Sequence, residues 1–402
     1  MKELSEISAA LAAADARREA AALATIIGVR GSTYRRPGAR LLITRSGQLT
    51  GNLSGGCLEG DVAVIAGEVL DQRAPRLMLY DLTADDDAVW GLGLGCNGAI
   101  EVFVEPINLA DPLWRAARDS VEGDKPIAVA TIVEGTPSAP AGRRIVIGPN
   151  GRRGTLGDGA VDAEVERLAQ RAVADLRSAT EAVRTSGDEL RVFLEVLHPP
   201  LRLVVCGAGH DAIPVVRFAA QLGWRVLVVD RRDALLNHER FPGATGFVRT
   251  EFPQAAEAVP TDPHTFVLIM THNYIHDRDL LRAFLPTDAA YLGMLGPRAR
   301  TDKIVRELEA EGVVMTAPRR AQIFGPVGLD IGSETPDEIA LAALGEILAV
   351  ARGRGGGFLR TRSAPIHTPA QDATAKEPAP ARGPGGAAAP RGLGKPTTPR
   401  EA

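Results

Sequence analysis

The sequence predicts an α/β protein in which a doubly wound parallel sheet follows a smaller N-terminal α+β domain. After Pro199 and Pro200, short apolar segments alternate regularly with helical segments, which is typical of a parallel sheet covered by helices. Before these prolines, β-branched segments and alanine-rich helical segments follow one another in mixed order. We therefore expect an N-terminal domain at 1–190, a C-terminal domain at 198–352 and a tail at 353–402.

The N-terminal elements follow from the local pattern of apolar residues. Helices are expected at the N-terminus, at 58–71, from 111 onward and at 162–183. Strands are expected at 22–29, 40–44, 76–81, 99–105, 127–132 and 144–147. This mixture of strands and helices is the basis for the α+β prediction.

The C-terminal elements alternate more regularly. Strands are expected at 201–206, 225–230, 265–270 and 289–292, and helices at 213–222, 277–284, 300–311 and 336–351. The last helix has the clearest start, because Thr335 suits the cap position, Pro336 the first helical position, and Glu338 completes a capping box.

Composition and charge exclude several classes of protein. The chain has 402 residues and a formal net charge of −4, which argues against a dedicated nucleic-acid-binding protein. Three cysteines cannot form a disulfide scaffold, and the N-terminus lacks a signal-peptide pattern, so we expect a cytoplasmic location. No apolar segment reaches the roughly 18 residues of a membrane span. The proline-rich tail at 353–402 is expected to be disordered.

A glycine-rich turn joins the first strand of the C-terminal domain to its first helix. Gly207, Gly209 and Ala212 have the spacing of the dinucleotide-binding fingerprint, in which glycines let a phosphate approach a helix N-terminus. His210 lies in this turn, and Asp230 ends the next strand, where an acid can bind a ribose hydroxyl. A scaffold without a ligand has the same pattern, and an ion pair with a neighbouring arginine equally explains Asp230. We predict a Rossmann-like domain that binds a phosphate-bearing ligand.

Three more polar or glycine-rich segments follow later strands of the same sheet. Ligands of such folds bind at the carboxyl ends of the strands. His272 and His276 are four residues apart, as metal ligands on a helix would be, but no third ligand has a recognisable spacing, so polar contacts or loop capping are favoured. The candidate binding residues in these segments are His272, Asn273, Gly296, Arg298, Gly328 and Asp330.

The N-terminal domain contains three glycine-rich loops without a nucleotide fingerprint. Consecutive glycines beside hydroxyl groups and arginines suit a backbone anion site, and a thiol in such a loop can hold sulfur or a soft metal. The alternative is that Cys57 is only a small residue in a tight turn, and Cys206 is expected in the core. The candidate residues in these loops are Ser32, Arg35, Arg36, Gly55, Gly56, Cys57, Glu59 and Cys96.

Several motifs in fixed order point to one family. They are Gly-Ser-Thr-Tyr-Arg-Arg-Pro-Gly-Ala, Gly-Gly-Cys-Leu-Glu, Gly-Cys-Asn-Gly, Cys-Gly-Ala-Gly-His, Met-Thr-His-Asn and Tyr-Leu-Gly-Met-Leu-Gly-Pro-Arg. Together they resemble the xanthine dehydrogenase accessory family of the XdhC/CoxF (XdhC/CoxI) type. The resemblance covers about residues 1–352, and Tyr34 stands where many members have proline.

The resemblance implies a maturation factor for molybdenum hydroxylases such as xanthine, aldehyde and carbon monoxide dehydrogenases. Such a factor binds the molybdenum cofactor, as molybdopterin or its cytosine dinucleotide, protects it during sulfuration and helps insert it into the apoenzyme. The implied partners are the large subunit of the apo hydroxylase, a cysteine desulfurase and a molybdopterin cytidylyltransferase, and a homodimer is expected. We expect no catalytic residues and no resident metal, with the molybdenum end of the cofactor near Cys57 or Cys96.

The main alternative is an NAD(P)-dependent oxidoreductase that uses the same fingerprint. It needs a proton donor, for which His272 or Tyr274 is available. However, the sequence has no Tyr-x-x-x-Lys pair or comparable dyad, and the N-terminal glycine loops would have no role. A protein-binding scaffold is a third hypothesis, in which replacing Gly207, Gly209 or Cys57 leaves function intact.

Overall fold

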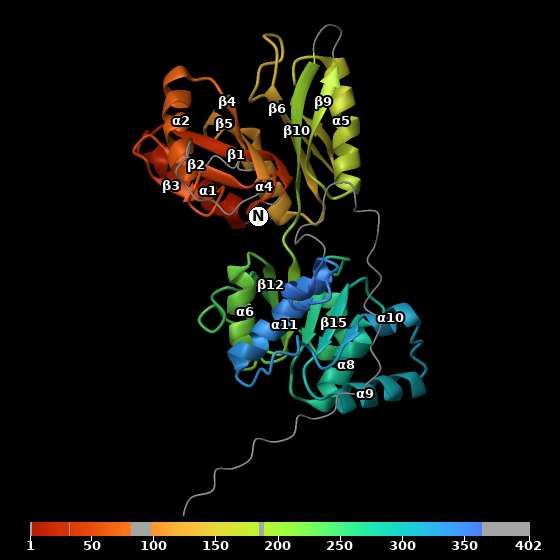
Figure 1. The fold of residues 1–402 in the computed structure, drawn as a ribbon. Helices are drawn as coiled ribbons and strands as arrows, with labels where there is room; N and C mark the ends of the chain where they lie inside the picture. Colours follow the sequence, from red (N-terminus) through yellow and green to blue (C-terminus); the bar gives the residue numbers. More distant parts are fainter. Residues whose placement is uncertain (1, 32, 82–97, 185–188, 364–402) are drawn as a thin grey trace, which may run out of the picture. The chain divides into compact units, whose positions relative to one another are not determined.

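The computed structural model describes residues 2–31, 33–81, 98–184 and 189–363 (Figure 1). Within this part of the chain, the N-terminal segment forms two five-stranded antiparallel sheets and the C-terminal segment forms a six-stranded parallel sheet. The predicted fold class is confirmed. The described helices include none that is both long and apolar enough to cross a membrane.

The first sheet has the strand order β3-β2-β1-β5-β4. Its strands are β1 (Ala21–Gly31), β2 (Arg40–Thr44), β3 (Leu49–Gly51), β4 (Arg76–Asp81) and β5 (Gly98–Ile107). Helix α1 (Lys2–Ala16) precedes β1, and helix α2 (Glu59–Gln72) lies between β3 and β4. Val62, Ala66 and Val69 recur on one face of α2 and are fully buried in the core of this sheet.

The second sheet repeats this arrangement, with the strand order β8-β7-β6-β10-β9. Its strands are β6 (Ile127–Glu134), β7 (Arg144–Gly148), β8 (Gly151–Arg153), β9 (Ala179–Arg184) and β10 (Glu189–Leu197). Helix α4 (Pro112–Glu122) precedes β6, and helix α5 (Gly159–Ala174) lies between β8 and β9. Each element therefore has a counterpart in the first sheet, and the N-terminal part is an internal duplication that the sequence analysis did not predict.

The strand registers show the duplication residue by residue. Thr25 pairs with Arg40 in the first sheet, and Thr131 pairs with Arg144 in the second. The turns before the two arginines are also equivalent, because Gly38 and Gly142 have φ angles of +96° and +90°. Few residues are identical between the repeats, so the similarity lies in backbone geometry and a few fixed positions.

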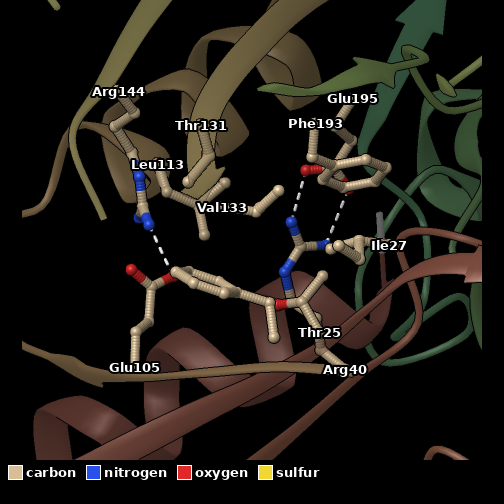
Figure 2. A pocket seen from close by; sticks show the side chains of 11 residues that line it. Thr25, Ile27, Arg40, Glu105, Leu113, Thr131, Val133, Arg144, Phe193 and Glu195 are labelled. Atoms are coloured by element: carbon tan, nitrogen blue, oxygen red, sulfur yellow. Dashed lines mark hydrogen bonds and ion pairs between the residues drawn. The ribbon is translucent and has the colours of Figure 1, made fainter. Parts of the chain in front are cut away.

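Two reciprocal buried ion pairs join the two sheets (Figure 2). Arg40 of β2 pairs with Glu195 of β10, with 2.7 Å between Nη1 and Oε1, and Arg144 of β7 pairs with Glu105 of β5. The side chains of all four residues are between 4% and 7% exposed. Arg144 also contacts Asp111, with 2.6 Å between Nη1 and Oδ1. Each arginine pairs with a carboxylate on the other sheet. The two pairs therefore fix the position of one repeat against the other.

The cavity between these side chains has a volume of about 10 Å³, room for about one water molecule. Arg40 Nε and Arg144 Nε are buried there without a hydrogen-bond partner among the described residues. Burial raises the pKa of Glu105 in spite of the opposing charge of Arg144. The size and enclosure of this centre make it part of the core, not a site for a cofactor.

The third sheet has the order β13-β12-β11-β14-β15-β16, with every pairing parallel. Its strands are β11 (Arg202–Cys206), β12 (Arg225–Asp230), β13 (Gly246–Arg249), β14 (Thr265–Ile269), β15 (Tyr291–Met294) and β16 (Ile323–Phe324). The chain begins in the middle at β11, continues outward through β12 and β13, and then returns to β14 on the other side of β11. This reversal is the topological switch point of a Rossmann-like sheet.

Helices lie between successive strands of the parallel sheet, and one long helix follows the last strand. They are α6 (Ala212–Gln221), α7 (Ala255–Ala258), α8 (Tyr274–Phe284), α9 (Arg298–Ala310), α10 (Ala317–Ala321) and α11 (Pro336–Ala351). The short 3-10 helices are η1 (Asp233–Leu235), η2 (Phe252–Gln254) and η3 (Leu359–Thr361). The predicted capping box of α11 is confirmed, because Glu338 Oε2 accepts from Thr335 N at 2.9 Å and Glu338 N donates to Thr335 Oγ1 at 3.3 Å.

Some predicted boundaries are wrong. The predicted helix at 162–183 is divided into α5, which ends at Ala174, and strand β9, because Leu176 between them has a φ of +52° that a helix does not continue through. Strands β3, β8, β9, β10, β13 and β16 were not predicted. Strand β10 carries the second sheet to Leu197, beyond the position 190 where we placed the end of the N-terminal domain. The predicted tail lies outside the described residues from position 364 onward.

Candidate functional site

The carboxyl ends of β11 and β14 define the candidate site, because ligands of open α/β sheets bind where the strand order reverses. The loop 207–210 follows β11, and the loop 271–273 follows β14. The two strands are direct parallel neighbours, with Cys206 opposite Ile269 at their last paired position. The structure therefore brings together two segments that are about 60 residues apart in the sequence.

Gly207 allows the two loops to approach each other. Its φ is +114°, and a Cβ at this position would lie 2.8 Å from the Met270 carbonyl oxygen and 3.0 Å from Thr271 Cα. Its amide donates to the Val229 carbonyl at 2.8 Å, which ties the loop to β12. Only glycine satisfies both the backbone angle and the close contact.

The next two residues of the loop have backbone amides without a hydrogen-bond partner, close to the start of α6 in the sequence. A Cβ at Gly209 would contact only the flexible side chain of Asp211, at 2.6 Å from Oδ1. His210 is exposed, and the Asp211 side chain makes no capping hydrogen bond to α6. Among the described residues, the amides of Gly209 and His210 have no hydrogen-bond partner. These amides and the positive end of the α6 dipole are available to an anion.

His272 links the two loops directly. Its Nε2 lies 2.6 Å from Asp211 Oδ2, while 61% of the imidazole side chain remains exposed. The His272 backbone has a φ of +58°, a left-handed conformation that is unfavourable for residues other than glycine. Strain of this kind concentrates at functional sites.

We expect His272→Gly to be more stable than His272→Ala by about 1 kcal/mol, because glycine alone relieves the left-handed backbone. Both variants lose the imidazole and its contact with Asp211, so the comparison isolates the strain. Chemical denaturation of the two variants measures the difference. An alanine variant as stable as the glycine variant would show that the loop is not strained.

Asp230 is fully buried at the end of β12 and holds the glycine loop in place. Its Oδ2 accepts from Ala208 N at 2.8 Å, and Arg232 surrounds both carboxylate oxygens with its backbone amide and guanidinium. Burial alone would raise the pKa of Asp230, but the hydrogen bonds from Arg232 and Ala208 outweigh it and lower the pKa below 3.8. The carboxylate is therefore ionised and engaged within the protein.

The lowered pKa of Asp230 implies that the stability of the protein depends on pH in acid. A carboxylate with a depressed pKa in the folded state contributes stability above its unfolded pKa, near 3.8, and loses it as the pH falls through the folded value. Asp230→Asn is therefore expected to be less stable than the wild type at pH 7, with a difference that narrows towards pH 3. Urea denaturation at several pH values measures this, with the exposed Asp288→Asn as the control. A stability difference between Asp230→Asn and the wild type that does not change with pH would contradict the lowered pKa of Asp230.

A second buried acid supports the loop after β14, in the polar segment that the sequence indicated, although it was not among the candidate binding residues. Asp277 on α8 is 1% exposed and accepts from the Thr271 amide at 3.2 Å and from its hydroxyl. Arg300 of α9 pairs with Asp277. Burial raises the pKa of Asp277 in spite of these contacts. The sequence did contain a signal for this acid, since the Asp277 carboxylate lies four residues after the helix cap Asn273.

Three predicted residues near this loop have other contacts or none. The Asn273 side chain caps α8 by accepting from Ile275 N at 3.0 Å and His276 N at 3.1 Å. Gly296 has a φ of +125° in the turn before α9, and Arg298, the first residue of α9, is exposed. Of these three, the structure shows only Asn273 in a side-chain contact, and that contact is a helix cap.

The loop before α11 is held by that helix. Glu346 Oε1 accepts from the Gly328 amide at 3.0 Å and from the buried Tyr291 hydroxyl at 2.6 Å. Gly328 has a φ of +113°, and a Cβ there would lie 3.2 Å from Ala342 Cβ. Asp330 is exposed. The Gly328 amide is thus already used within the protein.

In the N-terminal part, the loop 53–58 is organised by Ser54 and Glu59. Glu59 Oε1 accepts from the amides of Leu53 and Ser54, and Ser54 Oγ donates to Glu59 Oε2 at 2.6 Å. Ser54 Oγ in turn accepts from the amides of Gly56, Cys57 and Leu58. Burial alone would raise the pKa of Glu59, but these hydrogen bonds lower it. The amides of Gly56 and Cys57 are therefore satisfied by a side chain of the loop itself.

The equivalent loop of the second repeat keeps only part of this arrangement. Leu53 N donates to Glu59, and the corresponding Leu156 N donates to Asp162 Oδ1 at 2.7 Å. Between these residues, the first repeat reads Ser-Gly-Gly-Cys-Leu and the second reads Gly-Asp-Gly-Ala-Val. The fold therefore requires the leucine and the acid, but not Cys57, which is partly exposed.

The remaining N-terminal candidates are not brought together by the described contacts. Arg35 pairs with Glu3 of α1. Burial and the nearby charge of Arg177 lower the pKa of Arg36. A Cβ at Gly55 or Gly56 would meet nothing within 4 Å, although Gly56 has a φ of +112°. Ser32 and Cys96 lie outside the described residues.

The described residues contain no group of three or more His, Cys, Asp or Glu side chains that could hold a metal ion. His272 contacts Asp211, whereas the His276 ring packs against Phe252 with 5.0 Å between centroids. The prediction that Cys206 lies in the core is confirmed, since the residue is fully buried and burial raises the pKa of its thiol.

The fold and the site define a class of protein: a duplicated antiparallel N-terminal part followed by a Rossmann-like domain with a glycine-rich loop at its switch point. The chain belongs to the XdhC and CoxI family, whose model matches residues 14–81 and 120–184, while the model of the XdhC Rossmann domain matches residues 203–347. The two N-terminal matches fall on the two repeats. The resemblance inferred from the motifs is confirmed.

Named relatives cover most of the chain. A protein of Bacillus subtilis (strain 168), named as a probable xanthine dehydrogenase subunit, is 32% identical over 333 residues, 82% of this chain and 93% of that protein. The Escherichia coli (strain K12) molybdenum cofactor insertion chaperone PaoD is 23% identical over 330 residues, 82% of this chain and 83% of that protein. The crystal structure of a xanthine dehydrogenase from Bacillus halodurans matches with a TM-score of 0.70 at 28% identity, covering 87% of this chain and 96% of that chain.

Proposed function

We propose that this protein binds the molybdenum cofactor as cargo, protects it during sulfuration and helps insert it into a hydroxylase of the xanthine, aldehyde or carbon monoxide dehydrogenase type. It has no turnover of its own in this proposal, and it acts in the cytoplasm as a homodimer. Its partners are the large subunit of the apo hydroxylase and a cysteine desulfurase. The observation that carries the proposal is the glycine-rich loop 207–210 at the switch point of the sheet, in which the amides of Gly209 and His210 have no partner among the described residues.

The chemistry of the cargo fits this loop. Molybdopterin carries a phosphate, which suits the amides of Gly209 and His210 at the start of α6. Its polar pterin suits the exposed imidazole of His272, which is held by Asp211. A carrier must release its cargo, and the exposure of His210 and His272 leaves the site open to a receiving protein.

We further propose that Cys57 acts at the molybdenum end of the cargo. The duplicated fold supports this, since Ala160 occupies the equivalent position and the second repeat forms its helix without a thiol. Because the loop and helix form without a thiol at this position, the Cys57 side chain is available for contact with the ligand. The contributions of Arg35, Arg36, Glu59 and Cys96 stay predictions.

The proposal is tested by purifying the protein from a host replete in molybdenum and assaying the bound pterin by fluorescence. We expect bound pterin in the wild type and reduced hydroxylase activity in a strain that lacks the gene. Protein without pterin, together with normal hydroxylase activity in the deletion strain, would rule the proposal out.

For the thiol, Cys57→Ala is expected to keep the thermal stability within about 2 °C, because a partly exposed side chain contributes little packing. It should lower the yield of active hydroxylase in a reconstitution assay with purified cofactor. The matched control is Ala160→Gly in the second repeat, which changes the equivalent position without touching a thiol. Equal activity of Cys57→Ala and the wild type would exclude a role for the thiol.

A further inference from the structure

The end of β12 shows which form of the cargo this site accepts, given the proposed function on which this inference rests. In dinucleotide-binding folds, the acid at this position binds the hydroxyls of a nucleoside ribose. That contact requires carboxylate lone pairs that are free and face the ligand. The state of Asp230 therefore distinguishes a ligand with a nucleoside from one that ends at its phosphate.

The Asp230 carboxylate has no free acceptor position. Its Oδ1 accepts from Arg232 N and Arg232 Nε, both at 2.9 Å, and its Oδ2 accepts from Ala208 N and Arg232 Nη2, both at 2.8 Å. An ionised carboxylate offers about four lone-pair positions, and four donors occupy them. The residue is also 0% exposed. A ribose diol would have to displace the Arg232 guanidinium to reach it.

A second arginine closes the same region. Arg240 Nη2 donates to the Ala208 carbonyl at 3.2 Å, so the residue between Gly207 and Gly209 is held from both its amide and its carbonyl. The Arg240 guanidinium also lies over the Phe241 ring, 5.6 Å from its centroid. Two arginines that follow β12 therefore engage the loop and its supporting acid: Arg232 contacts Asp230, and Arg240 contacts the Ala208 carbonyl.

The loop that we propose to bind phosphate has, by contrast, donors that are not used within the protein. Gly207 keeps the turn, and the amides of Gly209 and His210 are without partners among the described residues. We propose that the cargo is molybdopterin ending in a single phosphate, and that the Asp230–Arg232 pair excludes its cytosine dinucleotide and the nicotinamide dinucleotides. Asp230 is then a positioning residue for the loop, and Arg232 determines specificity.

The test is calorimetric titration of the full-length chain with four ligands: the molybdopterin form of the cofactor, its cytosine dinucleotide form, NADH and NADPH. We expect the molybdopterin form to bind at least about tenfold more tightly than the other three, which is the value of about one charge-assisted hydrogen bond. A dinucleotide form that binds equally or more tightly overturns this inference and leaves the proposed function standing. Failure of both cofactor forms to bind overturns the proposed function itself.

Two variants identify the cause of the preference. Arg232→Ala removes the guanidinium contacts on Asp230 and is expected to reduce the preference for the molybdopterin form by at least about threefold. Arg231→Ala, at the exposed neighbouring position, is the matched control and should leave the preference unchanged. An unchanged preference in Arg232→Ala, with a folded protein by circular dichroism, would overturn the role of this arginine.

Discussion

Replacing Glu195 with alanine is expected to lower the free energy of unfolding by about 3–5 kcal/mol, because it leaves the charge of Arg40 buried and unpaired between the two N-terminal sheets. Burial decides this magnitude: the Arg40 side chain is 4% exposed and cannot regain water without opening the contact between the repeats. Urea denaturation at pH 7 measures the loss. The reciprocal change, Glu105→Ala, should also be destabilising because it removes the partner of Arg144 on the other sheet.

The control for this prediction is an exposed ion pair in the same sheet. Arg191 and Glu134 are 32% and 52% exposed, so Glu134→Ala should cost no more than about 1 kcal/mol. The double variant Arg40→Met, Glu195→Leu removes both charges together and should recover most of the loss. If Glu195→Ala and Glu134→Ala cost the same, the buried pairs do not hold the repeats together.

Gly207→Ala is expected to weaken binding of the cofactor by at least about tenfold. A Cβ at this position would lie 2.8 Å from the Met270 carbonyl oxygen at a φ of +114°, so the loop must shift and carry the amides of Gly209 and His210 away from the phosphate. The loss of one hydrogen bond to a charged group costs about 1.5–3 kcal/mol, or about tenfold or more in affinity. Calorimetric titration with the molybdopterin form of the cofactor measures this effect.

The matched variant Gly209→Ala separates ligand contact from folding. Its Cβ would meet only the flexible side chain of Asp211, so the variant should fold with near wild-type stability and still impair the approach of the phosphate. Gly207→Ala should additionally lower the stability of the protein by about 1–3 kcal/mol. Wild-type affinity in both variants would show that the loop does not bind the cargo.

Local patterns in the sequence were enough to predict the class of the C-terminal domain and four of its six strands. Strand 225–230 and helix 336–351 lie where they were predicted, because parallel strands are continuous apolar segments and Thr335 with Glu338 marks a helix start. The glycine fingerprint also located the switch point, since Gly207 and Gly209 encode a backbone geometry that other residues do not adopt. These signals lie within about ten residues of the feature they predict.

The sequence alone thus determined the fold class, the family and the position of the glycine-rich loop 207–210, because each depends on short segments. Only the tertiary structure decided that the N-terminal part is a duplication, that Arg40 pairs with Glu195 across two sheets, and that Arg232 saturates Asp230. The repeats share strand order and register but few residues, so the local patterns used for the prediction did not indicate them. Pairings between distant residues, and the burial that gives them their energy, arise only when the chain is folded.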